Sequence, residues 1–271
     1  MNPSFPPSPE TLLRGASHLG ILKELLASEL DRAPGIAFKT PFRERPAKGM
    51  GPFEAALRRA PVPVIGEFKR ASPSLGPFAL RAELGERVAA YARGGAAACS
   101  ILAEPARFLG RPEDFFAAKA FGLPVLYKGF VCTEAHLDEA AAFGAQAVLL
   151  IARLLGRHLP GFAAAARLRG LEPLVEVHEP GEIVHAQAAC VRMVGWNARD
   201  LTDFSVLRAP SALLREAFPG ALLVRESGLH SAGDAAAALA EFDAVLMGEA
   251  LMRAGDPAAV LGAIRRPGVR A

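Results

Sequence analysis

Short apolar runs rich in β-branched residues recur along the chain and alternate with longer segments of helical periodicity. Eight of these runs are predicted to be strands, at residues 62–68, 96–102, 124–130, 146–152, 172–178, 191–197, 221–227 and 243–248. Segments rich in Ala, Leu, Arg and Glu separate them, and helices are predicted at 81–93, 134–143, 157–169, 179–188 and 231–240. A strand followed by a helix, repeated along a chain, indicates a parallel sheet.

The predicted strands are apolar throughout instead of alternating between polar and apolar residues. The run at 147–152, Ala-Val-Leu-Leu-Ile-Ala, is an example, and such runs are typical of strands covered on both faces. Eight such units fit a closed (β/α)8 barrel, the TIM-barrel form of the α/β class, better than an open doubly wound sheet. The chain has no GxGxxG motif after the first predicted strand and no GxxxxGK[ST] motif anywhere, so the sequence gives no support to a nucleotide-binding sheet.

The first 60 residues precede the barrel and form a predicted N-terminal extension. A helix is predicted at 19–30 and a short one near 53–59. Because the first helix carries an apolar stripe, it must pack on something, and we expect the extension to cover one end of the barrel. The predicted division is therefore an extension at 1–60 and a catalytic barrel at 61–271.

Composition excludes several classes of protein. The 271 residues are 51% hydrophobic and 22% charged, which is typical of a globular protein with a large core. The net charge of +3 and the scattered basic residues give no support to a nucleic-acid or membrane partner. The three cysteines have no metal-site or disulfide spacing, and no apolar run is long enough to span a bilayer. A cytoplasmic location is expected.

The first predicted strand ends in an unusually polar stretch, Gly-Glu-Phe-Lys-Arg-Ala-Ser-Pro-Ser. Glu67 and Lys69 are two residues apart, so on an extended strand they point to one face, which we take to be opposite Ile65 or Phe68. Two opposite charges on a buried strand are typical of an active-site rim. A structural ion pair is an equally good interpretation of this segment alone.

Lysines are rare in this chain, which makes their positions informative. Only six of the 31 basic residues are lysines. Arginine does not readily release its proton, whereas a desolvated lysine can, so a lysine in an arginine-rich chain suggests proton chemistry. Two of the six, Lys69 and Lys128, are placed at the C-terminal ends of predicted strands, where barrels of this kind carry their reactive groups.

Other predicted strand ends add complementary groups. Lys128 and Glu176 are a candidate acid/base pair if burial moves their pKa values toward neutrality, the alternative being a salt bridge across the barrel. Asn197 and Arg199 suit a substrate hydroxyl or carboxylate. His178 is interpreted as a capping or loop residue and not as a metal ligand, because no second His or Cys shares its spacing.

Glycines close the last two predicted strands. Gly228 and Gly248 would let backbone N–H groups approach a ligand, and the following helix N-termini would favour an anion. A phosphate site formed by the loops after the seventh and eighth strands is the natural interpretation in a barrel. A simple turn is the alternative for either glycine considered alone.

The motifs together resemble the indole-3-glycerol phosphate synthase family. The similar segments are GEFKRASPSLG, GGAAACSILAEPARFLG, AVLLIARLL, LVEVH, VGWNARDL, VRESGL and AVLMGEALMR, in the order of the family's strands. The resemblance runs clearly from about residue 50 onward. It implies ring closure of 1-(2-carboxyphenylamino)-1-deoxyribulose 5-phosphate to indole-3-glycerol phosphate in tryptophan biosynthesis. Carbon dioxide and water are lost, and neither a cofactor nor a metal is used.

The resemblance also implies roles for individual residues. Lys128 would be the general acid at the substrate carbonyl, and Glu176 would handle the proton of dehydration. Lys69 would hold the substrate carboxylate or donate a proton, while Glu67 and Asn197 would orient hydroxyls. The remaining substrate-binding residues would be Arg199 near the leaving carboxylate, Phe108 and Phe130 as apolar walls, and Ser72, Ser227, Gly228, Gly248 and Glu249 at the phosphate. The expected partners are the small phosphosugar and other enzymes of the tryptophan pathway, with the chain itself a monomer.

Four residues depart from the family pattern, and two other functions stay open. Gly129 stands where the family usually has aspartate after the lysine of its third strand; Ala103, Leu75 and Trp196 are the other departures. A desolvated Lys128 could instead form a Schiff base, as in an aldolase. A non-catalytic phosphosugar-binding paralogue is the other alternative.

Overall fold

The computed structural model describes residues 5–15, 20–36, 49–72, 76–78, 84–198 and 210–265. Within these ranges, eight parallel strands close into a barrel in the order β1-β10-β9-β8-β7-β6-β5-β4. The barrel strands are β1 (Val64–Phe68), β4 (Ala98–Leu102), β5 (Val125–Lys128), β6 (Ala147–Ile151), β7 (Glu172–Val177), β8 (Met193–Asn197), β9 (Leu222–Glu226) and β10 (Ala244–Met247). All eight predicted strands are confirmed, as is the (β/α)8 fold.

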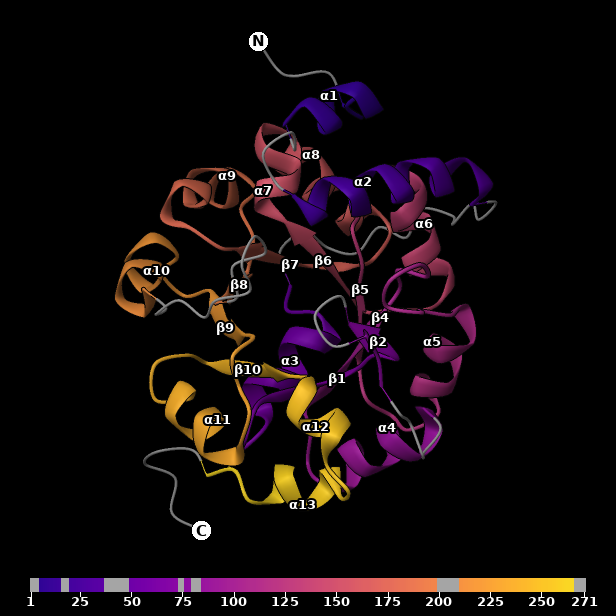
Figure 1. Cartoon of the computed structure of the whole chain (residues 1–271). Helices are drawn as coiled ribbons and strands as arrows, with labels where there is room; N and C mark the ends of the chain where they lie inside the picture. Colours follow the sequence, from indigo (N-terminus) through magenta and orange to yellow (C-terminus); the bar gives the residue numbers. More distant parts are fainter. Residues whose placement is uncertain are drawn as a thin grey trace.

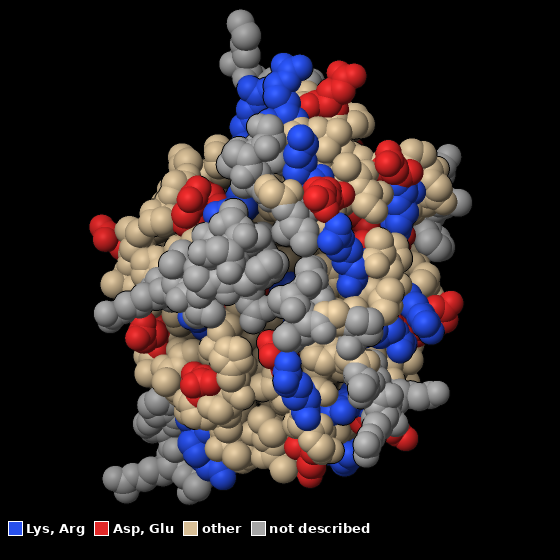
Figure 2. Space-filling view, viewed as in Figure 1, with Lys and Arg blue, Asp and Glu red and all other residues tan. Residues whose placement is uncertain are grey.

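Helices surround the strands (Figure 1). The α-helices after β1 are α4 (Leu84–Arg93), α5 (Pro112–Lys119), α6 (Glu134–Ala142), α7 (Ala152–Leu155), α8 (Leu159–Leu168), α9 (Ile183–Ala188), α10 (Ser211–Ala217), α11 (Ala232–Ala238), α12 (Glu249–Arg253) and α13 (Pro257–Gly262). The 3-10 turns η2 (Gly156–His158) and η3 (Pro180–Glu182) precede α8 and α9. A two-stranded hairpin, β2 (Ala71–Ser72) with β3 (Gly76–Pro77), follows β1 and was not predicted. Acidic and basic side chains are interspersed over the face that Figure 2 shows.

The side chains of each barrel strand alternate between two cores. Those facing the barrel axis, such as Ile65, Leu126 and Leu174, form one buried cluster together with residues of the N-terminal helices. Their neighbours in sequence, such as Val64 and Tyr127, pack outward against the helices in a second cluster. The continuous apolar runs therefore reflect strands that are covered on both faces.

The N-terminal helices are α1 (Pro9–Gly15), α2 (Ile21–Arg32) with the turn η1 (Ala33–Gly35), and α3 (Pro52–Arg59). Helix α3 packs at the N-terminal ends of the strands, where the backbone N–H groups of Phe53 and Glu54 donate to the carboxylate of Glu172, at distances of 2.9 and 3.0 Å. Helices α1 and α2 lie instead beside α7 and α6 (Figure 1). The extension and the barrel thus share one core, and the division at residue 60 stays a prediction.

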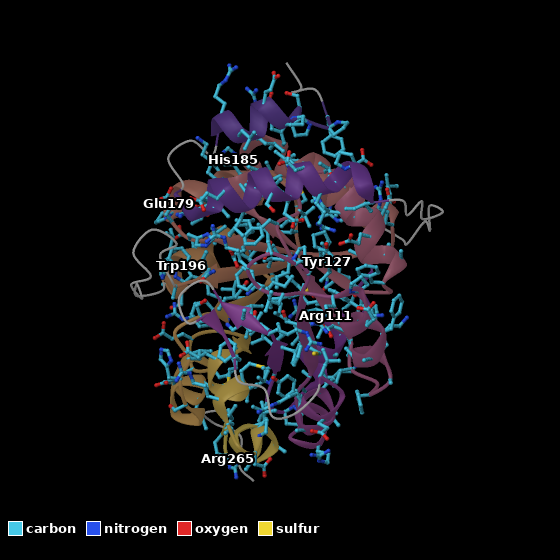
Figure 3. The ribbon with its side chains drawn as sticks, turned by 45° about the vertical axis from the view of Figure 1, so that its right-hand side comes forward. Arg111, Tyr127, Glu179, His185, Trp196 and Arg265 are labelled. Carbon is cyan, nitrogen blue, oxygen red and sulfur yellow. The ribbon has the colours of Figure 1, made fainter. Side chains whose placement is uncertain are left out.

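Helix α2 is joined to the barrel by a buried polar network. Arg32 donates to Glu29 at 2.7 Å and to Glu139 of α6 at 2.6 Å. The Glu139 carboxylate also accepts the hydroxyl of Tyr127 at 2.6 Å, and His136 Nε2 lies 3.0 Å from Glu29. Tyr127 lies well inside the molecule (Figure 3). The network therefore connects the extension to the strand that ends in the candidate acid Lys128.

Candidate active site

The candidate catalytic residues share one orientation at the C-terminal ends of their strands. Glu67, Lys128 and Glu176 each follow an axis-facing residue by two positions, and Asn197 follows the axis-facing Met193 by four, so the strand alternation directs all four side chains into the barrel. For β1, the sequence interpretation was half right. Glu67 lies opposite Phe68 as expected but on the same side as Ile65, because Ile65 packs in the axial cluster.

Glu67 bridges the two lysines of the site. Its Oε1 lies 3.0 Å from Lys69 Nζ, and its Oε2 lies 3.1 Å from Lys128 Nζ. Burial alone would raise the pKa of Glu67, but Lys128 and Lys69 outweigh it and lower that pKa to about 2. Glu67 is therefore a carboxylate that holds two ammonium groups at the mouth of the barrel.

Lys128 has a second carboxyl partner that the sequence interpretation left out of the site. Glu226, at the end of β9, places Oε2 3.2 Å from Lys128 Nζ and has no exposed surface. Burial and the charge of Glu176 raise the pKa of Glu226 to about 8, against the opposing effect of Lys128. The sequence carried a signal for this residue, since Glu226 has the same axis-facing position in β9 that Glu176 has in β7.

The acid/base interpretation of Lys128 and Glu176 required burial to move both pKa values toward neutrality. This expectation was wrong for Lys128. Burial would lower the pKa of Lys128, but Glu67, Glu226 and Glu176 outweigh it and raise that pKa. The site therefore holds Lys128 as a cation. This suits a proton donor and disfavours the neutral amine that a Schiff base requires.

Glu176 and His178 are neighbours at the end of β7. His178 Nε2 lies 3.2 Å from Glu176 Oε1, and both side chains are buried. His178 lies in the turn that follows the strand, where its backbone N–H donates to Glu182 at 2.8 Å. Among the described residues, no group of three or more His, Cys, Asp or Glu side chains could hold a metal ion.

A pocket joins the charged cluster to the loops after β9 and β10. Glu67, Lys69 and Lys128 line one side. Its other lining residues are Ser227, Gly228, Leu229, His230, Leu246, Gly248 and Glu249. The structure thus brings the four predicted rim residues of these loops to the pocket that holds both lysines.

The backbone of these two loops approaches the site closely. Ser227 and Gly228 have φ angles of 62° and 71°, which turn the chain sharply after β9. A Cβ atom on Gly248 would lie 2.4 Å from Glu67 Oε1, so glycine is required for Glu67 to keep its position. The Glu249 carboxylate lies 3.2 Å from Arg253, which is consistent with a role for its backbone only.

The predicted aromatic walls also meet. The ring centroids of Phe108 and Phe130 are 6.1 Å apart. The loop that carries Phe108 is held by the fully buried carboxylate of Glu104, which accepts backbone N–H groups from Ala106, Arg107 and Phe108 at 2.7–2.9 Å. This positioning role of Glu104 was not predicted.

Three sequence predictions cannot be placed at the side-chain level. Arg199 and Leu75 lie outside the described residues. Ser72 is described only through its backbone, as part of β2, where it pairs with Gly76. The contributions of Arg199 and Ser72 to substrate binding stay predictions.

Comparison with known proteins decides the family. The family model for indole-3-glycerol phosphate synthase matches residues 34–264. The chain belongs to the indole-3-glycerol phosphate synthase family. It is 46% identical over 209 residues to indole-3-glycerol phosphate synthase 2 of Streptomyces coelicolor, covering 76% of this chain and 81% of the relative. It is 42% identical over 223 residues to the synthase of Deinococcus radiodurans, covering 78% and 83%.

The indole-3-glycerol phosphate synthase assignment makes the chain a decarboxylating carbon–carbon lyase of tryptophan biosynthesis. Solved structures of other enzymes share only its fold. A tryptophan synthase structure from M. tuberculosis matches with a TM-score of 0.56 at 14% identity, over 79% of this chain and 95% of that one. Thiamine phosphate pyrophosphorylase from Pyrococcus furiosus matches with a TM-score of 0.54 at 18% identity, over 77% and 95%. None of the described helices is long and apolar enough to cross a membrane.

Proposed function

We propose that Lys128 is the general acid of the family's ring closure. In this step the aromatic carbon that bears the carboxylate bonds to the ketone carbon of the substrate, and the ketone oxygen takes a proton. Lys128 is cationic, faces the barrel axis and lines the pocket. A positioned ammonium group stabilises the charge that develops on the oxygen and can then deliver the proton.

Lys69 and Glu67 bind the substrate on the other side of this acid. Lys69 holds the substrate carboxylate, which leaves as carbon dioxide and returns an electron pair to the ring. The alternative role for Lys69 is to donate a proton in the later dehydration. Its contact with Glu67, at 3.0 Å, supports a cation that is pre-positioned for an anion. Glu67, on β1, and Asn197, on β8, orient the substrate hydroxyls.

Dehydration requires one group that removes a proton and another that protonates the departing hydroxyl. Glu176 is the base in this proposal. Glu226 is the acid, because a buried carboxyl with a pKa of about 8 keeps its proton at neutral pH. The raised pKa of Glu226, a buried carboxyl group that contacts the proposed acid Lys128, supports this division of roles.

The remainder of the substrate is bound by apolar walls and by backbone. Phe108 and Phe130 flank the aromatic ring, and their 6.1 Å separation supports a shared hydrophobic wall. The phosphate is bound at Ser227, Gly228, Gly248 and Glu249, with Ser72 contributing from the loop after β1. Arg199 completes the electrostatic environment of the leaving carboxylate.

We expect the active protein to be a monomer in the cytoplasm. We also expect it to associate with other enzymes of the tryptophan pathway. Size-exclusion chromatography coupled to light scattering at assay concentration checks the monomeric state, and a mass twice that of the chain would contradict it.

The experiment compares Lys128→Met with Lys119→Met in the conversion of the carboxyphenylamino-deoxyribulose phosphate. Lys119 is an exposed residue at the end of α5 and is the matched control. Lys128→Met should lower kcat by at least about a hundredfold with the far-UV circular dichroism unchanged, whereas Lys119→Met should retain activity. Undiminished turnover in Lys128→Met would refute the role, and a borohydride-trapped adduct on Lys128 would favour the Schiff-base alternative instead.

A further inference from the structure

The loop between β4 and α5 carries the proposed aromatic wall Phe108, and a buried side chain outside the chemistry described above sets its shape. The carboxylate of Glu104 has no exposed surface. Its Oε1 accepts the backbone N–H of Ala106 at 2.9 Å, and its Oε2 accepts those of Arg107 and Phe108 at 2.7 and 2.9 Å. Because three consecutive N–H groups share one buried carboxylate, the path of the backbone into Phe108 is fixed.

The main chain of this loop is also tightly closed. The backbone N–H of Gly110 donates to the carbonyl of Glu104 at 2.9 Å. A Cβ atom on Gly110 would lie 2.4 Å from the carbonyl oxygen of Leu102, so the close approach requires glycine. Leu109 has a φ angle of 56°, which is unfavourable for a residue with a side chain. A strained turn of this kind persists only where other contacts hold it, and the hydrogen bonds to Glu104 are such contacts.

The loop is anchored to the strand that carries the proposed acid. The backbone N–H of Ala103 donates to the carbonyl of Lys128 at 2.8 Å. Phe130 follows Lys128 by two residues, and its ring centroid lies 6.1 Å from that of Phe108 with the planes at 40°. One wall is therefore placed by the chain that leaves β5, and the other by the loop that Glu104 shapes.

A second contact reaches this loop from the N-terminal extension, but it lies in solvent. Arg107 Nη2 is 2.6 Å from Glu24 of α2, and the two side chains are 44% and 65% exposed. An exposed ion pair restrains a loop weakly. Removing a buried acceptor instead leaves backbone N–H groups without a partner, which is far more costly. The difference in burial identifies Glu104 as the stronger restraint on Phe108.

We propose that Glu104 is a positioning residue that sets the affinity of the site for the aromatic part of the substrate, by holding Phe108 against Phe130. This inference rests on the proposed role of these two rings as walls for the substrate ring. It assigns recognition of the ring to the β4 loop and separates it from recognition of the phosphate at the loops after β9 and β10. A structural role alone would weaken binding of both parts of the substrate alike.

The test measures the binding of two ligands to the full chain by isothermal titration calorimetry. One ligand is the substrate reduced at its ketone, which keeps the aromatic ring and cannot cyclise. The other is ribulose 5-phosphate, which has no aromatic ring. Glu104→Gln keeps the size of the side chain but replaces one acceptor oxygen by a donor. It should raise the Kd of the ring-bearing analogue by at least about tenfold and that of ribulose 5-phosphate by less than about threefold.

Glu24→Gln is the matched control, because it removes the exposed contact to the same loop. It should leave both Kd values within about twofold of those of the parent protein. A Glu24→Gln variant that reproduced the loss seen in Glu104→Gln would overturn the assignment to Glu104.

A double-mutant cycle determines whether Glu104 acts through Phe108. In a Phe108→Ala background, Glu104→Gln should raise the Kd of the ring-bearing analogue by less than about threefold. An equal loss in both backgrounds would overturn the proposal, as would parent affinity in a folded Glu104→Gln variant or an equal loss for ribulose 5-phosphate. If circular dichroism shows that Glu104→Gln does not fold, Glu104→Asp is measured in the same cycle and judged by the same outcomes. Aspartate keeps both acceptor oxygens but withdraws them by one methylene group.

Phe108→Ala alone separates failure of this inference from failure of the proposed function. If Phe108→Ala weakens binding of the ring-bearing analogue and Glu104→Gln does not, only the role of Glu104 is overturned. If Phe108→Ala binds the analogue as the parent does, Phe108 is not a wall for the ring, and the inference fails with that assignment. The role of Lys128 is tested separately, by turnover.

Discussion

Lys128 Nζ lies 3.2 Å from Oε2 of Glu226, a carboxyl group with no exposed surface. The pair crosses the mouth of the barrel from β5 to β9, strands that are far apart in its closed order. The pKa of Glu226 is raised to about 8, whereas the pKa of Glu67, on the other side of Lys128, is lowered to about 2. Lys128 therefore has one neutral and one charged carboxyl neighbour in this pair at pH 7. This asymmetry gives the site a proton donor besides the lysine.

Glu226→Gln should change how stability depends on pH. The folded-state pKa of about 8 lies above the ordinary value of 4.5, so between these values the folded protein binds more protons than the unfolded chain. The contribution of Glu226 is therefore fully present below pH 4.5 and is lost as pH rises through about 8. Urea denaturation between pH 5 and pH 8 should show a smaller loss of unfolding free energy in Glu226→Gln than in the parent. An equal loss in both would contradict the assignment.

Gly129→Asp, which introduces the family's usual residue, should be harmful here. A Cβ atom at this position would lie 3.0 Å from the ring of Tyr127 and 3.3 Å from Ala103. The Tyr127 ring is fixed by stacking on Phe115 and by its hydrogen bond to Glu139, so it cannot move away easily. We expect a loss of about 1–3 kcal/mol in unfolding free energy and a lower kcat.

Gly129→Ala is the control for this substitution, since it adds the Cβ without the carboxylate. It should reproduce most of the stability loss. If Gly129→Asp instead raised both Tm and kcat, crowding against Tyr127 would not explain why this chain has glycine where the family usually has aspartate.

Gly195→Ala should disable the site by displacing Glu226. Its Cβ would lie 2.0 Å from Glu226 Oε1, and this carboxyl is enclosed on all sides. We expect kcat to fall by at least about tenfold, since Glu226 would leave Lys128. Gly35→Ala, whose Cβ would have no atom within 4 Å, should leave turnover unchanged. Steady-state kinetics check both variants, and parent-like activity in Gly195→Ala would show that the contact between Glu226 and Lys128 is dispensable.

Tyr127→Phe should cost more stability than Tyr91→Phe, the same substitution at the chain's other tyrosine. The Tyr127 hydroxyl donates to a charged carboxylate, Glu139, at 2.6 Å, whereas the Tyr91 hydroxyl donates to the neutral carbonyl of Glu67 at 3.1 Å. Hydrogen bonds to charged groups contribute about 1.5–3 kcal/mol and neutral ones about 0.5–1.5 kcal/mol. Urea denaturation of the two variants measures the difference. Equal losses would mean that Glu139 finds another donor.

The strand positions could be predicted from sequence because strands buried on both faces leave a continuous apolar signal. The positions of Glu67, Lys128 and Glu176 follow from the predicted strand ends, because reactive groups of such barrels lie there. The helices predicted at 19–30 and near 53–59 correspond to α2 and α3, whereas α1 was not predicted. Helix α2 spans Ile21–Arg32, so it begins and ends two residues later than the predicted 19–30, because no polar side chain caps its start.

The interactions between these residues could not be predicted, because they depend on distances across the barrel. Nothing in the sequence near β9 shows that Glu226 is fully buried next to Lys128. Nor does that sequence show that Glu176 and Lys128 shift the pKa of Glu226 in opposite directions. The same holds for His178, whose sequence context predicts a capping or loop residue, although its ring lies between Glu176 and Glu182. The direction of the Lys128 pKa shift depends on three carboxyls contributed by three different strands.

The most direct measurement is the stoichiometry of the reaction in the purified protein. Indole fluorescence and released carbon dioxide are followed together during incubation with 1-(2-carboxyphenylamino)-1-deoxyribulose 5-phosphate. The account predicts one carbon dioxide for each indole-3-glycerol phosphate formed, with both lost in Lys128→Met. Binding of the substrate, detected as a rise in Tm, without formation of either product would contradict the account and indicate a phosphosugar-binding protein.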